Sequence, residues 1–477
     1  MSTEANPKTG NASSFALPRL SVMMFLQFFA WGAWFATLAL AMGNNGLGDF
    51  IGGAFESSPI GAIISPLFLG LIADRLFASE KVMGCLMLLG GIIMSVIALV
   101  APQGAEYGNL IVWLMIAYML CYMPTLGLGN TITFTHLPQE KFSQARVWGT
   151  IGWIAAGLML GFAGWSDSLN IFWVGAISSF VLGLYCFTLP STPPPDRDKP
   201  LDFKSLLMVD AWKLLGNFPF LVFAVCSTLL CIPLGYYYGQ TSAYLGAAGF
   251  HEPASAMTIG QMSEIIFMIL IPFFFRKLGV KTMLLVAMVC WIARYALFAM
   301  GAPNQVMWML LIGVALHGIC YDFFFVTGFI YTDKKAPARV RGQAQSLLVF
   351  LTQGLGLFFG FRMAFGAKFP FTSIALPNQY DRYGVVPGDD NHKPLMDAIA
   401  DNKGETEGSF VDSLTGMFGQ GYPEGVDPAL VEQGMTAWHY YWIFPAIMAS
   451  VIFVVFALLF WDRVDIDDPN EEDSGQQ

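Results

Sequence analysis

The chain has 477 residues, of which 55% are hydrophobic, 15% are aromatic and only 12% are charged. In soluble domains about a quarter of the residues are charged. The low charged fraction of this chain therefore excludes a water-soluble globule and makes lipid the solvent for much of its surface. The formal net charge of −10 excludes little by itself, because the placement of charges matters more than their sum.

The first 19 residues are polar and lack the basic-then-apolar pattern of a signal peptide. The apolar runs that follow are long enough to cross the bilayer as helices, which takes about 20 residues. Continuous apolar runs favour helices over a barrel, whose strands alternate. The sequence therefore predicts an all-α integral membrane protein with twelve transmembrane helices, at 20–42, 57–74, 82–101, 109–130, 146–165, 169–190, 218–242, 256–275, 282–301, 305–331, 342–364 and 437–461.

Basic residues mark one side of this arrangement. The five short loops predicted outside hold none. The loops predicted inside and the two tails hold 18 of the 24 basic residues: Arg75, Lys81, Lys141, Arg146, Arg197, Lys199, Lys204, Lys213, Arg276, Lys277, Lys281, Lys334, Lys335, Arg339, Arg341, Lys8, Arg19 and Arg463. The positive-inside rule then places both termini in the cytoplasm.

Two longer segments interrupt the helices. A basic cytoplasmic connection, 191–217, separates an N-terminal six-helix half, 20–190, from a C-terminal half, 218–461. An acidic external insertion, 366–436, lies within the second half, and an acidic cytoplasmic tail, 462–477, follows it. Two six-helix halves around a midplane site are the plan of many secondary transporters. For the insertion we expect decoration of the external mouth.

Several classes of function have no support in the sequence. There is no G-x-x-x-x-G-K-[ST] loop for ATP and no set of nucleophile, base and orienting group that would suggest an enzyme. The cysteines all lie inside apolar runs, which indicates core packing rather than disulfides or metal ligation; they are Cys85, Cys121, Cys186, Cys226, Cys231, Cys290 and Cys320. We expect an ion gradient as the driver, no cofactor, no nucleic-acid partner and a monomer.

Ionisable groups within the spans are the informative ones, because a charge at the bilayer centre costs at least about 2.5–3.5 kcal/mol. Glu264 lies midway along the span 256–275 and shares a helix face with Gln261, three residues earlier. A carboxyl in apolar surroundings favours its neutral form, which suits a proton carrier. The alternative is a structural ion pair, for example with Arg294.

The span 305–331 carries a second polar cluster. His317 and Tyr321 are one turn apart on one face, and Asp322 is the next position round the helix. A single His in a span is often only an interhelical hydrogen-bond donor, but three polar groups within two turns favour a site. Arg294 is expected to be a structural counter-ion, and Arg362, near the outer end of its span, to snorkel to the interface.

A third group opens the span 146–165. Arg146, Thr150 and Trp153 are spaced i, i+4 and i+7, which places them on one stripe of a helix. A donor fork, a hydroxyl and a flat apolar face together suit a ring that carries hydroxyls. The alternative for Arg146 is an anchor on the inner side, and the uncertain start of this span leaves both open.

These residues bring the chain close to a known family. Gly70-Leu-Ile-Ala-Asp74-Arg75 is similar to the loop motif of the major facilitator superfamily, although Leu76-Phe77-Ala78 replaces its usual basic continuation. More specific segments resemble the bacterial nucleoside:H⁺ symporter family: Tyr122-Met-Pro-Thr-Leu-Gly-Leu128, Asn130-Thr-Ile, Arg146-Val-Trp-Gly-Thr-Ile-Gly152, Gln261-Met-Ser-Glu264, Ile271-Pro-Phe-Phe, Leu278-Gly-Val-Lys281, Trp291-Ile-Ala-Arg-Tyr-Ala-Leu-Phe298 and Tyr321-Asp-Phe-Phe324.

The resemblance implies a major facilitator fold and proton-driven import of nucleosides across the bacterial inner membrane. It assigns substrate binding to Arg146, Thr150, Trp153, Gln261, His317 and Tyr321, proton coupling to Glu264 and Asp322, and structural or gating roles to Asp74, Arg75 and Arg294. Two polar positions of the family in the span 218–242 correspond to Gly235 and Tyr238.

Two other functions stay open. The stretch from Arg146 to Trp153 is also similar to that of oligosaccharide:H⁺ symporters, although those carry an acid where this chain has Asn130. A sugar symporter is therefore one alternative. A receptor that senses an external solute through the insertion without transporting it is the other.

Overall fold

The computed structural model describes residues 16–68, 77–194, 208–337, 340–365, 392–402, 411 and 415–462. The predicted gating residues Asp74 and Arg75 lie outside this set. Within it, secondary structure is helical apart from one isolated antiparallel bridge between Phe250 and Gln420. Apolar sequence in lipid favours this outcome, because a helix satisfies its own backbone hydrogen bonds.

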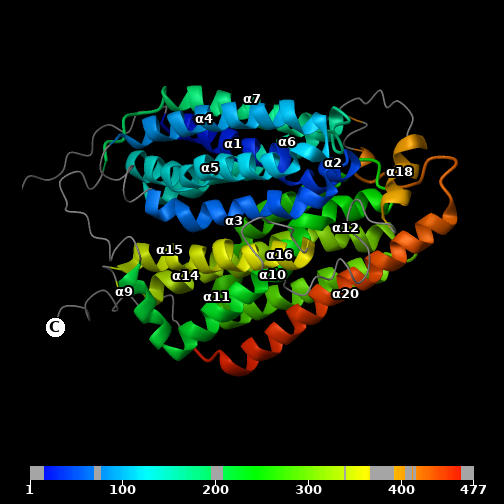
Figure 1. Ribbon diagram of the computed structural model, residues 1–477. Coiled ribbons are helices and arrows are strands. Elements are labelled where there is room, and N and C mark those ends of the chain that lie inside the picture. Colours follow the sequence, from blue (N-terminus) through cyan, green and yellow to red (C-terminus); the bar gives the residue numbers. More distant parts are fainter. Residues whose placement is uncertain are drawn as a thin grey trace, which may run out of the picture.

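The helices up to residue 186 form one group (Figure 1). In it α1 packs against α6 and α7, α4 against α5 and α7, and α3 against α5. The members are α1 (Ala16–Phe35), α2 (Leu38–Asn44), α3 (Ile51–Phe68), α4 (Ser79–Val100), α5 (Gly108–His136), α6 (Gln139–Phe162) and α7 (Asn170–Cys186).

The remaining helices form a second group beside the first (Figure 1). They are α9 (Val209–Trp212), α10 (Phe218–Ala247), α11 (Pro253–Gly301), α12 (Met307–Ala315), α13 (His317–Tyr321), the π-helical turn η6 (Asp322–Val326), α14 (Thr327–Lys335), α15 (Arg341–Val349), the π-helical turn η8 (Phe350–Gly356), α16 (Leu357–Phe365), α18 (Lys393–Asn402) and α20 (Pro428–Leu459). Here α10 packs against α16 and α20, and α11 against α12, α13 and α20.

Ten described segments are long and apolar enough to cross a membrane, and α7 is a shorter apolar helix. The long α11 contributes two of the ten, Pro253–Ile271 and Phe273–Gly301. Gly279, with φ 67° and ψ 173°, interrupts its helical geometry between the spans predicted at 256–275 and 282–301. A positive φ of this kind favours glycine. The last helix, α20, begins at Pro428, so the final residues of the predicted external insertion belong to this helix.

The two groups meet along α6 and α11, along α3 with η8 and α16, and along α2 with α10. Ile63 of α3 approaches Gly354 of η8, and Leu40 of α2 approaches Gly246 of α10. These contacts run from the middle of the bundle to the end that carries α18, which lies opposite α9 in Figure 1.

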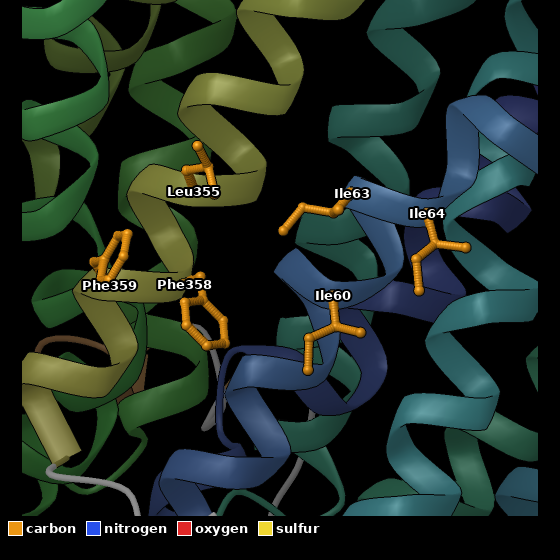
Figure 2. Close-up of a pocket in the computed structure, with 6 residues that line it drawn as sticks. All are labelled: Ile60, Ile63, Ile64, Leu355, Phe358 and Phe359. Atoms are coloured by element: carbon orange, nitrogen blue, oxygen red, sulfur yellow. The ribbon is translucent and has the colours of Figure 1, made fainter. Parts of the chain in front are cut away.

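An apolar groove of about 320 Å³ lies between α3 and the η8–α16 segment (Figure 2). Its lining is Ile60, Ile63, Ile64, Leu355, Phe358 and Phe359. None of these residues offers a polar side-chain atom, and Ile64 and Phe359 are exposed at the surface of the bundle. The groove therefore suits contact with lipid rather than recognition of a polar solute.

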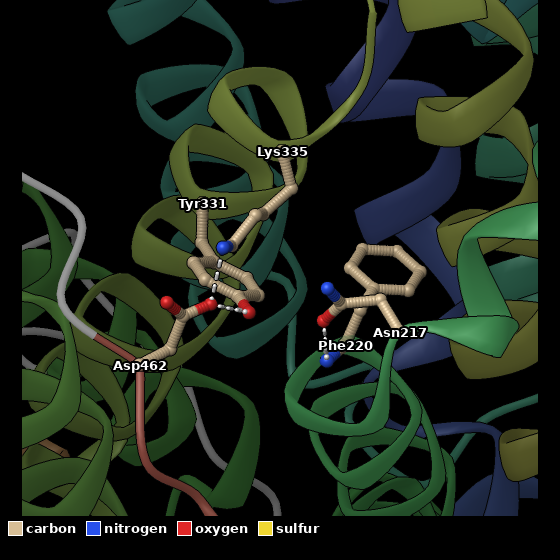
Figure 3. A network of polar contacts seen from close by, with 5 residues as sticks. All are labelled: Asn217, Phe220, Tyr331, Lys335 and Asp462. Atoms are coloured by element: carbon tan, nitrogen blue, oxygen red, sulfur yellow. Dashed lines mark hydrogen bonds and ion pairs between the residues drawn. The ribbon is translucent and has the colours of Figure 1, made fainter.

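A polar network joins helix ends of the second group at the end away from α18 (Figure 3). Asp462, just after α20, accepts a hydrogen bond of 2.7 Å from the Tyr331 hydroxyl and forms an ion pair of 2.7 Å with Lys335. Close by, the side chain of Asn217 accepts from the backbone N–H of Phe220 and so caps α10. The end of α20 is thereby fastened to the end of α14.

Part of the predicted insertion is packed onto the bundle rather than projecting from it. Leu395 of α18 is buried against Gly434, and Met396 approaches Gly246 of α10. After α18, the side chain of Gln420 donates to the carbonyl of Ala248 over 2.9 Å. The segment thus contacts both α10 and α20, and α18 also touches α2 of the first group.

His392, just before α18, makes this docking sensitive to pH. Burial against the ring of Trp438 lowers the pKa of His392 to about 4, below the ordinary value near 6.5. The undocked segment therefore binds more protons between these two values. Docking is most stable above about pH 6.5 and loses up to about 3 kcal/mol as the pH falls toward 4.

We expect hydrogen exchange of residues 392–402 to rise between pH 7.5 and pH 5, after correction for the intrinsic exchange rate. A His392→Gln variant, which has no ring to protonate, should show little of this change. An equal pH dependence in both proteins would contradict the role of His392.

Candidate functional site

Helix α6 carries the predicted stripe of Arg146, Thr150 and Trp153. It begins at Gln139, so Arg146 lies two turns inside the helix rather than at its inner edge. The guanidinium of Arg146 stacks on the ring of Phe28 in α1 at 4.1 Å from the centroid. Its Nη1 is buried and has no hydrogen-bond partner in the described part of the chain.

A hydrogen bond joins the two helix groups at the middle of the bundle. The Thr150 hydroxyl of α6 donates to Oε1 of Glu264 in α11 over 3.3 Å. Glu264 is buried, and the charge of Arg146 acts on it from the same side. The alternative of an ion pair between Glu264 and Arg294 is wrong, because no such pair forms and Arg294 has other neighbours.

Those neighbours lie in the second group. Arg294 is fully buried and donates from Nη2 to Nδ1 of His317 over 3.2 Å. Its guanidinium lies over the ring of Tyr237 at 4.1 Å and over that of Trp291 at 5.2 Å. No carboxylate among the described residues pairs with Arg294, so the expected role as a counter-ion to a buried acid is wrong.

Asp322 opens the π-helical turn η6 inside the predicted tenth span. It is fully buried, and neither carboxyl oxygen has a hydrogen-bond partner among the described residues. π-helical turns inside helices occur frequently at functional sites. Burying a carboxyl without a partner is costly, so this position marks Asp322 as a candidate functional group rather than a packing residue.

Aromatic side chains link the predicted residues of the two groups. From Trp153 the chain of ring contacts runs through Phe35 to Tyr238 and His317, with centroids 5.7–6.1 Å apart. His317 then lies 5.7 Å from Tyr321. Trp153, Tyr238 and Tyr321 are all only half-buried. They leave ring surface accessible between the two groups.

Gln261 shares the α11 surface with Glu264, as its spacing predicts. It is buried, and its Oε1 has no hydrogen-bond partner in the described ranges. Of the two positions in α10, Tyr238 belongs to the aromatic chain. Gly235 instead allows close contact with the backbone of Gly360 in α16, so it contributes helix packing and no polar group.

Gly318 permits a close crossing between α13 and α11 at Ser263 and Glu264. A Cβ atom at Gly318 would lie 2.5 Å from the backbone nitrogen of Glu264. The Ser263 hydroxyl accepts a hydrogen bond of 2.9 Å from the Gly318 N–H and donates to the carbonyl of Ala315 over 2.6 Å. Helices α11 and α13 are thereby held in one register.

We expect Gly318→Ala to cost about 1–3 kcal/mol of folding stability through overpacking and to lower solute uptake, because the added methyl group forces α11 and α13 apart. The matched control is Gly342→Ala, since a Cβ at this helical glycine of α15 meets nothing within 4 Å. The test compares uptake and thermal stability of the purified variants. Unchanged values for Gly318→Ala would contradict the crossing geometry.

The sequence reasoning missed an ion pair near the α18 end. Glu56 of α3 and Arg362 of α16 lie 3.5 Å apart, fully and almost fully buried. The expectation that Arg362 snorkels to the interface is wrong, because the guanidinium turns inward to this carboxylate. The rings of Phe361 and Phe365 stack on Phe55 beside it, at 5.0 and 5.5 Å.

A sequence signal for Glu56 existed. It is the one charged residue in the stretch from Ile51 to Phe68, just outside the predicted edge at residue 57. Its pairing with a residue 306 positions away has no signature in a single sequence. Among the described residues, no three His, Cys, Asp or Glu side chains are grouped so that they could hold a metal ion.

Comparison with known proteins adds a family context to this geometry. The sequence model of a family described as "Nucleoside H+ symporter" matches residues 16–373. A relative from Escherichia coli (strain K12) with the name "Putative nucleoside transporter YegT" is 41% identical over 357 residues, 72% of this chain and 83% of the relative. Nucleoside permease NupG of the same organism is 31% identical over 361 residues, 72% of this chain and 85% of NupG.

The fold has solved counterparts as well. A crystal structure of a variant of the nucleoside transporter NupG superposes with a TM-score of 0.72 at 24% sequence identity, over 94% of this chain and all of that one. This likeness concerns the fold. It extends beyond the residues that the family model matches, into the last helix.

Proposed function

Because the chain belongs to the nucleoside H⁺ symporter family, a family of transporters, we propose that it imports nucleosides by proton symport and alternating access. One observation carries this proposal. A buried carboxyl, Glu264, accepts a hydrogen bond from Thr150 across the boundary between the two helix groups. A group in this place can couple its own protonation to the movement of one half against the other.

The proposed topology has twelve spans. The ten candidate segments together with α3 and α7 make this number. The basic loops then lie on the side of α9 and place both termini in the cytoplasm under the positive-inside rule. The halves are 20–190 and 218–461, joined by 191–217 and carrying the insertion 366–436 on the outside. The protein is a multi-pass protein of the bacterial inner membrane, and we propose that it works as a monomer.

The conformation supports alternating access. Among the described residues, contacts between the halves run from the middle of the bundle to the side of the insertion, where Glu56 pairs with Arg362 and Phe55 stacks on Phe361 and Phe365. We assign this arrangement to a state closed toward the outside. In proteins with two such halves, the halves rock about a substrate site near the midplane, which is the level of Thr150 and Glu264.

The nucleoside would lie at this level. Trp153 and Tyr321 offer ring faces on which the base can stack. Arg146, Thr150, Gln261 and His317 offer hydrogen-bonding groups for the ribose hydroxyls and the base. Glu264, with Asp322 behind it in η6, would carry the proton. Asp74 and Arg75 are proposed to gate the inner side. The proton gradient supplies the energy, and the proposal requires no cofactor.

Uptake by purified protein in proteoliposomes tests the proposal. With an inward proton gradient, labelled uridine or inosine should accumulate above the external concentration, and a protonophore should prevent this. Unlabelled nucleosides should compete for uptake, and lactose should not. Competition by lactose alone would establish the sugar symporter instead. Binding without counterflow exchange would favour a receptor.

A further inference from the structure

Arg294 and His317 form a buried unit whose chemistry is determined by one hydrogen bond. Nη2 of Arg294 lies 3.2 Å from Nδ1 of His317. A guanidinium has N–H donors and no acceptor, so Nδ1 must be the acceptor. The imidazole then holds its single hydrogen on Nε2. A second hydrogen on Nδ1 would point at the guanidinium and abolish the bond, so His317 stays neutral.

The surroundings of the pair hold the imidazole in one orientation. Tyr237 stacks on the imidazole at 5.1 Å and an angle of 16°, and the same tyrosine ring carries the Arg294 guanidinium. A Cβ atom at Gly260 would lie 3.1 Å from the Cβ of His317, so the backbone of α11 closes that side. Neither the tautomer nor the rotamer of His317 can change without moving Arg294 or Tyr237.

The other edge of the ring points to the proposed site. Nε and Nη1 of Arg294 are sealed from solvent, whereas Nε2 of His317 is not among the sealed atoms. Nε2 has no hydrogen-bond partner in the part of the chain that the structure describes. The rings of Tyr238 and Tyr321 also contact the imidazole, with centroids 6.0 and 5.7 Å away. Both are half-buried.

We propose that Arg294 is a positioning residue for substrate selection: it presents His317 as an obligatory Nε2–H donor to an acceptor atom of the nucleobase. This inference rests on the proposed function. The base is the favoured partner, because the neighbouring tyrosine rings suit a flat aromatic heterocycle, whereas the Arg146 guanidinium and the Glu264 carboxyl suit hydroxyls. A ring nitrogen or carbonyl oxygen accepts from this edge, and an amino group does not.

Nucleosides that differ by one acceptor atom test the proposal. Inosine is compared with 7-deazainosine, which lacks the N7 acceptor. Uridine is compared with pyrimidin-2-one riboside, which lacks the oxygen at C4. The measured quantity is the ratio of the inhibition constants within each pair, from competition with labelled uridine. In the unmodified protein we expect a ratio of about ten for at least one pair, because a buried donor loses its partner.

The ratio should fall below about two in His317→Phe and in Arg294→Met, because neither presents a fixed donor. Arg294→Lys keeps a donor to Nδ1 and should restore much of the ratio. General damage to folding or transport weakens both members of a pair alike and leaves their ratio unchanged. Size-exclusion chromatography and binding of labelled uridine identify the folded variants. If Arg294→Met does not fold, the ratio measured in His317→Phe decides the test.

The outcomes separate the two proposals. If the unmodified protein binds nucleosides but shows ratios near one for both pairs, or if Arg294→Met and His317→Phe keep the full ratio, the role of Arg294 is overturned while nucleoside transport stands. If the unmodified protein neither binds nor exchanges any nucleoside, the proposed function itself fails.

Discussion

Replacing Glu264 by Gln is expected to abolish accumulation of nucleoside against a gradient while counterflow exchange persists. An inward gradient of two pH units stores about 2.7 kcal/mol per proton, which drives up to about 100-fold accumulation when one proton accompanies one nucleoside. In Glu264→Gln the ratio of internal to external nucleoside should fall to about one. The amide oxygen can still accept from Thr150, whose bond to Glu264 joins the two halves, but the side chain has no proton to release.

Two further variants make this result specific. Glu252→Gln changes an acid at the start of the same helix, where Glu252 accepts from Ser166 near the external side, and it should accumulate nucleoside normally. Asp322→Asn removes the second buried carboxyl. If Glu264→Gln still accumulates substrate and Asp322→Asn does not, the proton travels on Asp322, and the role assigned to Glu264 is wrong.

Removing one partner of the Glu56–Arg362 pair is expected to open the external side. The pair is buried between α3 and α16, and a buried charge that loses its partner costs about 3–5 kcal/mol. This cost falls on the closed state alone if opening exposes Glu56 to water. Arg362→Met should therefore shift the balance between closed and open states by at least about 100-fold toward open.

Distances between spin labels on the two halves can measure this shift. Glu106 in the first half and Asn304 in the second are exposed and lie in loops predicted to be external. In Arg362→Met the distribution of distances between labels at these two positions should shift to longer distances. The charge-exchanged double variant Glu56→Arg with Arg362→Glu should return it toward that of the unmodified protein.

Lys393→Met is the matched control for the loss of a cation. It removes one partner of an exposed pair with Asp397, and such pairs contribute only about 0–1 kcal/mol, so it should leave the distances unchanged. An unaltered distribution in Arg362→Met would show that the buried pair does not hold the external side closed.

Much of this arrangement could be predicted from sequence, because it depends on residues that are close together in the chain. Long apolar runs separated by charge predict helices in lipid. The spacing of Arg146, Thr150 and Trp153, and that of Gln261 and Glu264, follows helix geometry alone. The structure agrees in both cases. The structure also places the Thr150 hydroxyl within hydrogen-bonding distance of Glu264, which fits the proposal that both belong to one site.

The parts that escaped prediction depend on long-range packing. The partners of Arg294 and Arg362 are His317 and Glu56, and a choice among several buried polar groups needs the relative rotation of the helices. The π-helical turn at Asp322 is another example. Nothing in Asp-Phe-Phe-Phe-Val distinguishes it from a regular helical turn, and it changes which way every later side chain of the span faces.

The most direct test of the central claim follows protons and nucleoside together. Proteoliposomes enclose a pH-sensitive dye and start without any pH gradient. On addition of external uridine or inosine, the account predicts acidification of the lumen at the rate of nucleoside entry, no acidification with lactose, and none with Glu264→Gln. Entry of nucleoside without movement of protons would contradict it.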